Sequence, residues 1–332
     1  MEEPENIKTD TPNEEEIKGN LIEEEVDELA VDIPDIPLPS AEHTQEAVIE
    51  DEFDSAYKFA IVGVGQGGSR LAETFWKLGY RRVAVINTAA QDLKPIALPE
   101  KNKLLIGGAG AGKNRKVAQK LFEEHREDIL DFLKKAFTSG IDRILVCIGA
   151  GGGTGAGGGP VVVVCHDLCQ TFGVEQSDYE AKVGAVLALP TKSEGSRVKS
   201  NAKETADSLI KYSTNGTLSP LIILDNERIK HLYPKLSVNK FWNTANTSIC
   251  SLFHLFNKIA AQDSEYTAFD KADLDTVMSS GIISFGAVPV RATGETIEET
   301  DISHAVRDNL KKNILANIDV NTGKFAACVV IG

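Results

Sequence analysis

The fold of this chain is decided by residues 148–160, Ile148-Gly149-Ala150-Gly151-Gly152-Gly153-Thr154-Gly155-Ala156-Gly157-Gly158-Gly159-Pro160. The apolar run at residues 143–148 predicts a buried strand, and residues 161–169 predict a buried helix that Pro160 opens. A glycine turn at a helix N-terminus leaves bare N–H groups pointing at one spot, where the helix dipole adds partial positive charge. The stretch therefore predicts a phosphate-binding turn and not a flexible linker, which would not lie between two apolar elements.

A second strand–turn–helix unit lies nearer the N-terminus. Residues 58–62 predict a strand and residues 71–78 a helix, and the turn between them reads Gly63-Val64-Gly65-Gln66-Gly67-Gly68-Ser69-Arg70. The spacing Gly-x-Gly-x-x-Gly in this setting is typical of dinucleotide binding. The next strand, residues 82–86, ends in Asn87, where an NAD-binding enzyme carries an acidic residue for the ribose. An NAD-dependent oxidoreductase is therefore weakened but stays an alternative.

A third glycine segment, Gly107-Gly108-Ala109-Gly110-Ala111-Gly112-Lys113-Asn114, is close to a P-loop. Asn114 stands where a P-loop has the Ser or Thr whose hydroxyl binds magnesium. Beyond it, the pattern predicts a helix at residues 115–132, strands at 182–189 and 220–224, and a long helix at 241–262.

Charge divides the chain into a tail and a body. Residues 1–55 hold 20 acidic residues and two lysines, a net charge of −18, whereas the whole chain carries −14. This segment is expected to be a disordered acidic tail that keeps the chain in solution or binds a protein partner. The five cysteines lack disulfide-framework spacing, which suits a reducing cytoplasm. We expect no membrane span and no direct binding of nucleic acid.

The glycine motifs resemble, in order, the nucleotide loops of the tubulin/FtsZ family of GTPases. Gly151-Gly152-Gly153-Thr154-Gly155 is similar to the family's signature loop, and Gly65-Gln66-Gly67-Gly68 to the tubulin form of the first loop. Residues 87–93 resemble the second loop of FtsZ, with Ala89 where FtsZ has Asp. Residues 107–114 resemble the third loop, over the γ-phosphate, and residues 190–197 the fifth, whose Glu and Arg reach the ribose.

The resemblance implies that GTP or GDP binds together with magnesium, for which no protein ligand is assigned. Asn226 and Asn246 match the asparagines that read the base, and Trp242 matches the aromatic that stacks on guanine. Core packing is the alternative for Trp242, and a solvated ion pair the alternative for Glu194 with Arg197. The implied nucleotide-binding residues are Gly65, Gln66, Gly67, Gly68, Arg70, Asn87, Ala109, Gly110, Gly152, Gly153, Thr154, Gly155, Glu194, Arg197, Asn226, Trp242 and Asn246.

Residues 268–278 resemble the synergy loop of FtsZ. Asp270 and Asp273 match its two acids and are implied to be catalytic, while Ala268 replaces its Asn. Capping of a helix N-terminus by either aspartate is the alternative, and both roles can coexist. The resemblance implies a head-to-tail homopolymer in which these acids complete the nucleotide pocket of the next subunit. A nucleotide-binding regulator that does not polymerise is the other alternative.

The expected fold is α/β. A parallel-sheet GTP-binding domain flanked by helices would span residues 56–262, including the long central helix. A smaller, incomplete α+β domain, with the synergy loop, would span residues 263–332. Residues 281–286, 302–315 and 325–330 resemble the first half of the family's C-terminal domain, so we expect an open sheet edge there.

Overall fold

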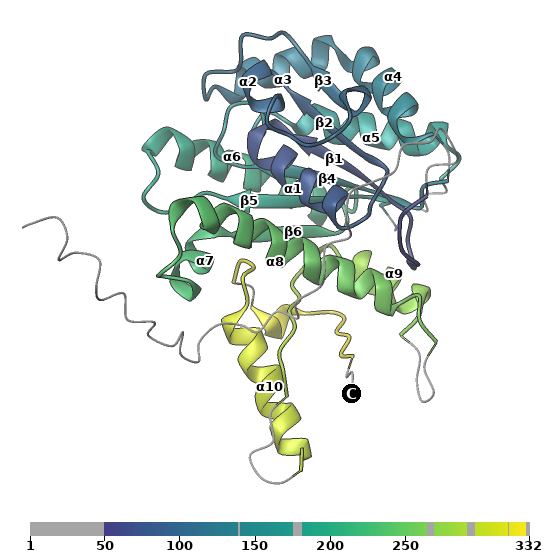
Figure 1. Cartoon of the computed structure of the whole chain (residues 1–332), viewed down its shortest axis with the longest axis vertical. Helices are drawn as coiled ribbons and strands as arrows, with labels where there is room; N and C mark the ends of the chain where they lie inside the picture. Colours follow the sequence, from purple (N-terminus) through teal and green to yellow (C-terminus); the bar gives the residue numbers. More distant parts are fainter. Residues whose placement is uncertain are drawn as a thin grey trace, which may run out of the picture. The chain divides into compact units, whose positions relative to one another are not determined.

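The computed structural model describes residues 50–138, 140–174, 181–263, 269–290, 296–317 and 319–329. Its centre is a seven-stranded sheet in the order β3-β2-β1-β4-β5-β6-β7, in which every pair is parallel (Figure 1). The strands are β1 (Phe59–Val64), β2 (Val83–Asn87), β3 (Lys103–Leu105), β4 (Arg143–Gly149), β5 (Val183–Leu189), β6 (Leu221–Asp225) and β7 (Ile282–Ile283). The expected α/β fold with a parallel sheet is confirmed.

Helices lie between successive strands of the sheet, as parallel pairing requires. The helices are α1 (Gly65–Lys77), α2 (Ala90–Leu93), α3 (Arg115–Glu124), α4 (Arg126–Phe137), α5 (Gly159–Thr171), α6 (Ser196–Thr214), α7 (Asn226–Leu232), α8 (Val238–Ile259), α9 (Lys271–Met278) and α10 (Glu299–Lys312). Two short 3-10 helices, η2 (Glu100–Asn102) and η3 (Val320–Thr322), complete the described elements.

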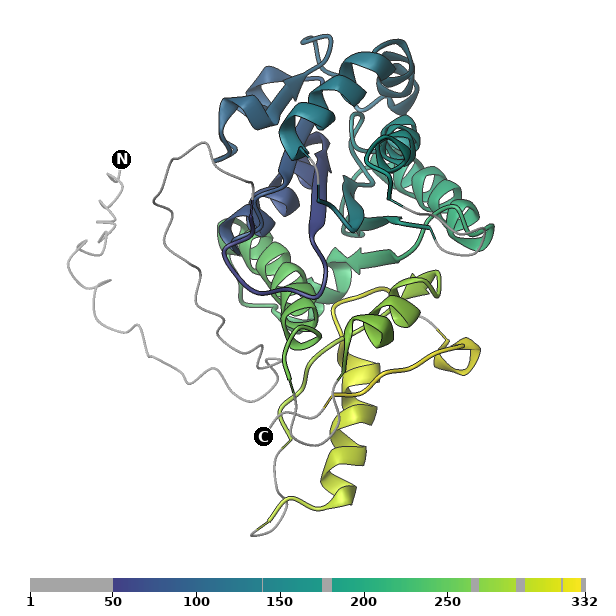
Figure 2. The ribbon, with the colours of Figure 1, turned by 90° about the vertical axis from the view of Figure 1, so that its right-hand side faces the viewer.

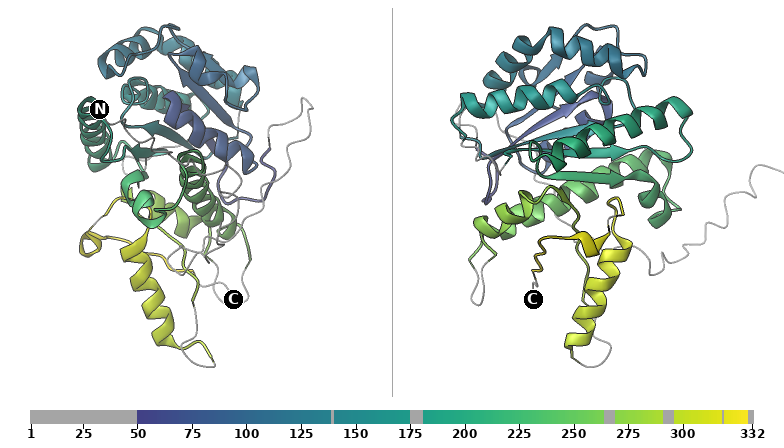
Figure 3. Two further views of the ribbon diagram at one scale, coloured as in Figure 1. Left: turned by 60° about the vertical axis from the view of Figure 1, so that its left-hand side comes forward. Right: turned by 180° about the vertical axis from the view of Figure 1, so that it is seen from behind.

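The strands bury apolar side chains on both faces, which makes the sheet the middle of three layers. In β1, Phe59 and Ile61 belong to the core shared with α1 and α8, whereas Ala60 and Val62 belong to the core shared with α3, α4, α5 and α6. Helices therefore cover both faces (Figure 2; Figure 3). This burial on both faces explains why the strands read as continuous apolar runs in the sequence.

Three helices show the largest departures from their expected bounds. The helix expected at 115–132 is two helices, because His125 leaves the helical conformation (φ −104°, ψ 26°) and ends α3 one residue before α4 begins. α1 begins at Gly65, so the first glycine motif forms its first turn. α8 runs from Val238 to Ile259, starting and ending about three residues before the long helix that we expected.

The sheet continues past the expected domain boundary at residue 263. β7 pairs with β6, with Ile283 opposite Ile222, so the main sheet includes a strand from the last part of the chain. After β7, the described residues form α10, η3 and irregular segments but no further strand. Ala268 and residues 330–332 lie outside the described residues. The division at residue 263 otherwise stays a prediction.

The ordered body begins a few residues before the expected end of the tail. The N–H of Arg81 donates to Asp51 Oδ1 at 2.9 Å, and the N–H of Glu52 donates to the carbonyl of Gly79 at 3.0 Å. The ring of Phe53 packs edge-on against Tyr80 with centroids 4.8 Å apart. Residues 51–53 are therefore part of the fold, and residues 1–49 of the predicted tail lie outside the described residues.

None of the helices in the described part of the chain combines the length and the apolar character that crossing a bilayer requires.

Candidate functional site

The two main glycine loops meet where the order of the strands reverses. The chain runs outward from β1 through β2 to β3 and then returns to form β4 on the other side of β1. In open parallel sheets, ligands bind at the carboxyl ends of the strands at such a switch point. The first glycine motif lies at the turn from β1 into α1, which we call the first loop, and the loop after β4 consists of residues 150–158.

These two loops touch through their backbones. A Cβ atom at Gly65, where φ is +70°, would lie 2.6 Å from the backbone N of Gly155. A Cβ atom at Gly155 would lie 2.5 Å from the carbonyl oxygen of Gly149. No side chain fits in this space, so glycine is needed for the approach of the two loops.

The second and third loops close onto the same place. Thr88 and Thr154 share a buried hydrogen bond between their hydroxyls at 2.7 Å, and the N–H of Gly110 donates to the carbonyl of Thr88 at 2.7 Å. A Cβ atom at Gly153 would lie 2.8 Å from the Cβ of Ala111. Four loops from four neighbouring strands thus converge on Thr154.

Two helix N-termini at this place have no side-chain cap. α1 follows Val64 and α5 follows Gly158, and neither residue supplies a capping hydrogen bond. In α5, Pro160 has no N–H and the N–H of Val161 donates to the carbonyl of Gly158 at 3.0 Å, so Gly159 supplies the first N–H there. The N–H groups of the first turn of α1, the N–H of Gly159 and the two helix dipoles favour an anion. α3 differs, because the side chain of Asn114 accepts a hydrogen bond from the N–H of Lys116. Asn114 therefore serves its own helix.

Several of the expected phosphate-side residues face outward at the convergence. Those with exposed positions are Gln66, Gly67, Arg70, Ala109 and Gly152. Gly65, Gly68, Asn87, Gly153, Thr154 and Gly155 are buried beneath them, and Gly110 is half-buried. The carboxyl edge thus presents exposed residues over a buried layer of glycines, Asn87 and Thr154.

The fifth loop folds back on itself. Glu194 Oε1 accepts a hydrogen bond from the N–H of Thr191 at 2.9 Å, and Arg197 is exposed. No hydrogen bond or ion pair joins Glu194 to Arg197 among the described contacts, so their alternative interpretation as an ion pair is not what the structure shows. The N–H of Lys192 donates to Glu227, which holds the pKa of Glu227 below its usual value.

The three base-side residues lie on α7 and α8. Asn226 is the first residue of α7 and is buried. Trp242 is half-buried and packs edge-on against Phe241, with ring centroids 5.1 Å apart, and Asn246, one turn later on α8, is half-buried. Packing against the core therefore accounts for part of the Trp242 side chain, and its exposed part remains open to a ligand.

Three buried polar atoms at the carboxyl edge lack a hydrogen-bond partner. They are Ser69 Oγ, Asn87 Nδ2 and Asn226 Oδ1. Buried polar groups in folded proteins are nearly always paired, so an unpaired one needs an explanation. A polar ligand bound across this edge would supply such partners.

One residue of this region was not found from the sequence. Asn201, on α6, donates from Nδ2 to the carbonyls of Lys113 at 2.9 Å, Gly152 at 3.1 Å and Gly151 at 3.3 Å. It therefore holds the third loop against the glycine loop. A single Asn within a polar helix carries no motif, so no sequence signal pointed to it.

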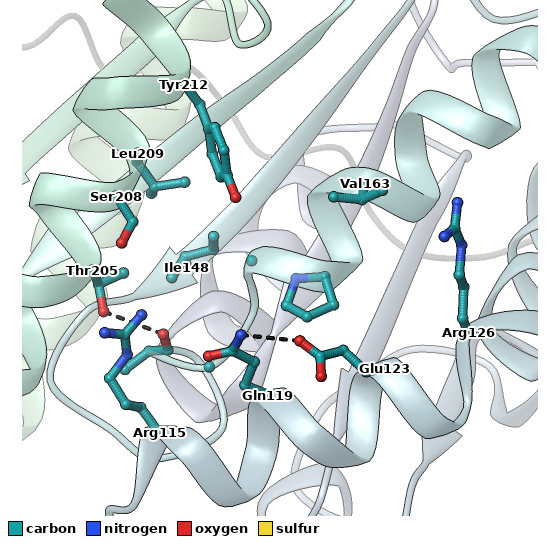
Figure 4. A pocket seen from close by; sticks show the side chains of 14 residues that line it. Arg115, Gln119, Glu123, Arg126, Ile148, Val163, Thr205, Ser208, Leu209 and Tyr212 are labelled. Atoms are coloured by element: carbon teal, nitrogen blue, oxygen red, sulfur yellow. Dashed lines mark hydrogen bonds between the residues drawn. The ribbon is translucent and has the colours of Figure 1, made fainter.

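A cleft of about 350 Å³ lies behind the glycine loop, between α3, α5 and α6 (Figure 4). Its charged groups are already engaged, since Arg115 pairs with Glu204 at 2.7 Å and Arg126 contacts Asp167. Figure 4 shows Gln119 hydrogen-bonded to Glu123, and Thr205 to a carbonyl of the glycine loop. The cleft shares Ala156, Gly157 and Gly159 with the glycine loop and the start of α5.

The two expected catalytic acids lie near the amino ends of the strands, which we call the amino edge of the sheet, opposite the carboxyl edge that carries the glycine loops. Asp270 caps α9 by accepting from the N–H groups of Ala272 and Asp273, and Asp273 accepts in return from the N–H of Asp270. The capping alternative is therefore realised in the structure. α9 is joined to Arg143, the first residue of β4, whereas the glycine loop follows the last. The structure does not bring these acids to the loops of the same chain.

The described residues contain no cluster of three or more His, Cys, Asp or Glu side chains that could hold a metal ion. Magnesium normally binds through one or two carboxylates together with phosphate oxygens and water. The residues placed at the loop convergence include no carboxylate, so they do not form a metal site by themselves. An ion there would have to be held mainly by phosphates.

The family model of the tubulin/FtsZ family, GTPase domain, matches residues 58–234. That range contains β1 to β6 and the loops that converge at their carboxyl ends. The chain belongs to the tubulin/FtsZ family, whose members are GTPases. The NAD-dependent alternative has no support from this match.

Individual relatives agree with the family match. Cell division protein FtsZ 1 of Pyrococcus furiosus is 24% identical over 325 residues, which are 96% of this chain and 78% of the relative. Cell division protein FtsZ 2 of Methanocaldococcus jannaschii is 28% identical over 294 residues, 86% of this chain and 69% of the relative.

Solved structures show the same fold. A protofilament of TubZ from Bacillus thuringiensis serovar israelensis, in its GTPγS form, superposes with a TM-score of 0.67 at 19% identity, over 80% of this chain and 72% of that one. CetZ from Methanosaeta thermophila superposes with a TM-score of 0.54 at 25% identity, over 68% of this chain and 61% of that one. This chain thus spans less than two thirds of the CetZ chain.

Proposed function

We propose that this chain binds GTP at the carboxyl edge of its sheet and assembles head to tail. In this proposal Asp270 and Asp273 of one subunit complete the pocket of the next, where GTP is hydrolysed. One observation carries the proposal: the loops and the acids lie at opposite edges of one sheet, so no subunit can complete its own site. The TubZ neighbour, whose structure is a protofilament, supports the assembly.

The phosphates would lie on the loop convergence. The N–H groups that begin α1 and the N–H of Gly159 at the start of α5 would bind their oxygens, and the exposed residues around them would flank the chain of phosphates. Backbone donors position a triphosphate but supply no group that takes a proton from the attacking water. Hydrolysis would therefore wait for the carboxylates of a neighbour. Magnesium, carried by the phosphates, would neutralise charge there.

The base would lie between α7 and α8. The unpaired Asn226 Oδ1 can accept a hydrogen bond from guanine, Asn246 can supply a second amide, and the exposed part of Trp242 can stack on the ring. Glu194 and Arg197, on the loop after β5, would lie on the ribose side. A cytoplasmic location and a protein partner for the acidic tail remain predictions.

Competition between nucleotides tests the binding half of the proposal. Adenine lacks the O6 acceptor and the N2 donor that the two asparagines would contact, and each unsatisfied buried group costs about 1–3 kcal/mol. GTP should therefore bind at least about tenfold more tightly than ATP in a fluorescence competition titration. Equal competition by ATP would contradict the assignment of the base site.

Mixing of subunits tests the shared site. Asp273→Ala should keep GTP affinity and lose turnover, because α8 alone spans about 33 Å and separates this residue from the loops of its own chain. Adding Asp273→Ala subunits to the unsubstituted protein should lower turnover per unsubstituted subunit. The added Asp273→Ala subunits should also sediment together with the unsubstituted protein. Turnover that ignores the added variant would favour a nucleotide-binding regulator that does not polymerise.

A further inference from the structure

One buried arginine joins the amino edge of the sheet to α9. Arg143 is the first residue of β4, and its side chain is fully buried. Its guanidinium donates from Nε to Asp275 Oδ1 at 3.0 Å and contacts the same carboxylate through Nη2. Nη2 also donates to Ser279 Oγ at 2.7 Å. Arg143 therefore contacts α9 within its last turn and at the residue that ends it.

The same guanidinium holds the starts of two further strands. Nη1 donates to the carbonyls of Ala181 at 3.0 Å and Ser219 at 3.4 Å, which lie just before β5 and β6. Buried ionic groups are tolerated only when they are paired and hydrogen-bonded, as Arg143 is. The planar fork of arginine fixes the direction of each bond. The position of α9 is thus tied to three neighbouring strands.

A second ion pair fixes the orientation of α9 about its own axis. In this pair the helix supplies the cation, whereas in the pair with Arg143 it supplies the anion. Asp142, the residue before Arg143, contacts Lys271 Nζ at 3.0 Å and also accepts from the N–H of Lys58 at 2.8 Å. Lys271 and Asp275 are four residues apart, so they lie on one face of the helix. Turning the helix would break both pairs together. Only this orientation of α9 places Lys271 beside the carboxylate of Asp142 and Asp275 beside the guanidinium of Arg143.

Tyr57 fills the space between the two pairs. Its hydroxyl donates to the carbonyl of Lys271 at 3.2 Å, and Lys271 Nζ lies 4.7 Å from the centre of its ring. Asn257, near the end of α8, hydrogen-bonds both the N–H and the carbonyl of Tyr57, at 2.9 and 3.0 Å. The amino edge thereby connects α9 to α8 as well as to the sheet.

We propose that the Arg143–Asp275 pair is a positioning pair for hydrolysis, which fixes α9 so that Asp270 and Asp273 meet the nucleotide of the neighbouring subunit. This inference rests on the proposed shared site. In this proposal neither member of the pair touches a nucleotide, and both act through the position of α9. A displacement of about 1 Å at a reacting group can cost about a hundredfold in rate, so a rigid mounting for the two acids has kinetic value.

The ionisation of Asp275 agrees with this role. Burial disfavours its carboxylate, but the nearby Tyr57 hydroxyl, the hydrogen bonds from Arg143 and the charges of Arg143 and Lys182 outweigh that effect and hold its pKa below the usual value. The pair therefore stays charged at neutral pH.

Asp275→Asn tests the pair, because it removes the charge and keeps the shape of the side chain. We expect turnover at saturating GTP to fall about tenfold to a hundredfold, while KM and the GTP affinity of dilute subunits change less than about twofold. Asp275→Glu, which restores the charge, should recover part of the turnover. Asp131→Asn, which removes an exposed carboxylate that lies 4.0 Å from Lys134 on α4, is the matched control and should change nothing.

Complementation separates positioning from folding. Asn226→Ala subunits have a damaged base site but an intact α9. Mixed with Asp275→Asn subunits, they should raise turnover above the sum of the two separate activities, since intact α9 helices then meet intact pockets. Unchanged turnover of Asp275→Asn alone would overturn the inference. So would a parallel loss of GTP affinity and thermal stability in both Asp275 variants, which would mark a merely structural pair.

The proposed function has a separate point of failure. If Asp273→Ala retains turnover, the shared site itself is wrong, whatever Asp275→Asn does. If Asp273→Ala abolishes turnover and Asp275→Asn leaves it unchanged, only the positioning role is wrong.

Discussion

The carboxyl and amino edges of the sheet are held together by different kinds of contact. At the carboxyl edge, backbone meets backbone, as where Gly65 approaches Gly155 too closely for any side chain. At the amino edge, side chains make the contacts, with Arg143, Asp275 and Tyr57 at the centre. The first edge should therefore fail when an atom is added, and the second when a partner is removed. The difference suits an edge that receives a ligand and an edge that carries a fixed helix.

The largest expected effect comes from adding one methyl group at the carboxyl edge. A Cβ atom at Gly68 would lie 2.1 Å from the carbonyl oxygen of Cys147, so Gly68→Ala must push α1 away from β4. We expect a loss of at least about 3 kcal/mol in the free energy of unfolding, measured by urea denaturation. Gly159→Ala adds the same methyl group where nothing lies within 4 Å and should leave stability unchanged. Equal stability of the two variants would break the comparison.

The next effect tests, by titration, the cost of placing a charge on a buried side chain near the amino edge. His254 is buried against Phe53 and Tyr80, and burial with the charge of Lys258 lowers its pKa to about 4. The unfolded state binds the proton near pH 6.5, so stability should fall as the pH drops from about 6.5 to 4, by up to about 3 kcal/mol.

Thermal melts of the unsubstituted protein and His254→Leu across this range measure that contribution. The stability of His254→Leu should not show this decrease as the pH falls. The buried carboxyl of Asp51 has a raised pKa, mainly through burial, so it acts with the opposite sign, but it is present in both proteins. Identical pH profiles for the two proteins would show that His254 is not the titrating group.

A smaller effect concerns the carboxyl edge, where the side chain of Asn201 holds two loops together. Asn201→Ala removes the donor that three loop carbonyls share, and water can reach the exposed Lys113 and Gly152 in its place. We expect about 1 kcal/mol weaker nucleotide binding, roughly fivefold, with little change in melting temperature. Calorimetric titration measures it, and a drop in stability without a change in affinity would contradict it.

The smallest effect concerns the acidic tail. Deleting residues 1–49 should leave GTP affinity unchanged within about twofold, because charge beyond about 10 Å is screened at 0.1 M salt. Deleting residues 1–55 is the matched contrast, since it also removes Phe53, whose ring lies 4.3 Å from that of His254. Only the longer deletion should lower the melting temperature. A large loss of affinity in the shorter deletion would show that the tail belongs to the binding site.

The carboxyl edge could be predicted because backbone contact leaves a mark in the sequence. Where two loops touch, glycine is required, and glycines at fixed spacing between apolar runs are visible without a structure. The positions of β1, β4 and α5 followed from residues 143–169 and their counterpart near Gly65. The break of the helix at His125 did not, because neither proline nor glycine marks it.

The amino edge could not be predicted, because its partners are far apart in the chain. Arg143 and Asp275 are separated by 132 residues, and each taken alone is an ordinary charged residue near the end of an element. Asn201 is hidden for the same reason. Contacts between side chains depend on the fold, so no local pattern reports them. The roles of Asp270, Asp273, Asn226 and the other nucleotide-binding residues remain predictions.

β4 connects these two edges directly. It is a seven-residue strand, roughly 20 Å long at about 3.3 Å per residue, with Arg143 at one end and the glycine loop at the other. A strand hydrogen-bonded on both sides hardly changes length, so β4 keeps a fixed distance between Arg143 and the glycine loop inside each subunit. In the row of subunits that we propose, the length of β4 would be one fixed part of the spacing from one nucleotide to the next. Sequence changes on the surface would leave that part of the spacing unchanged, provided that β4 keeps its number of residues.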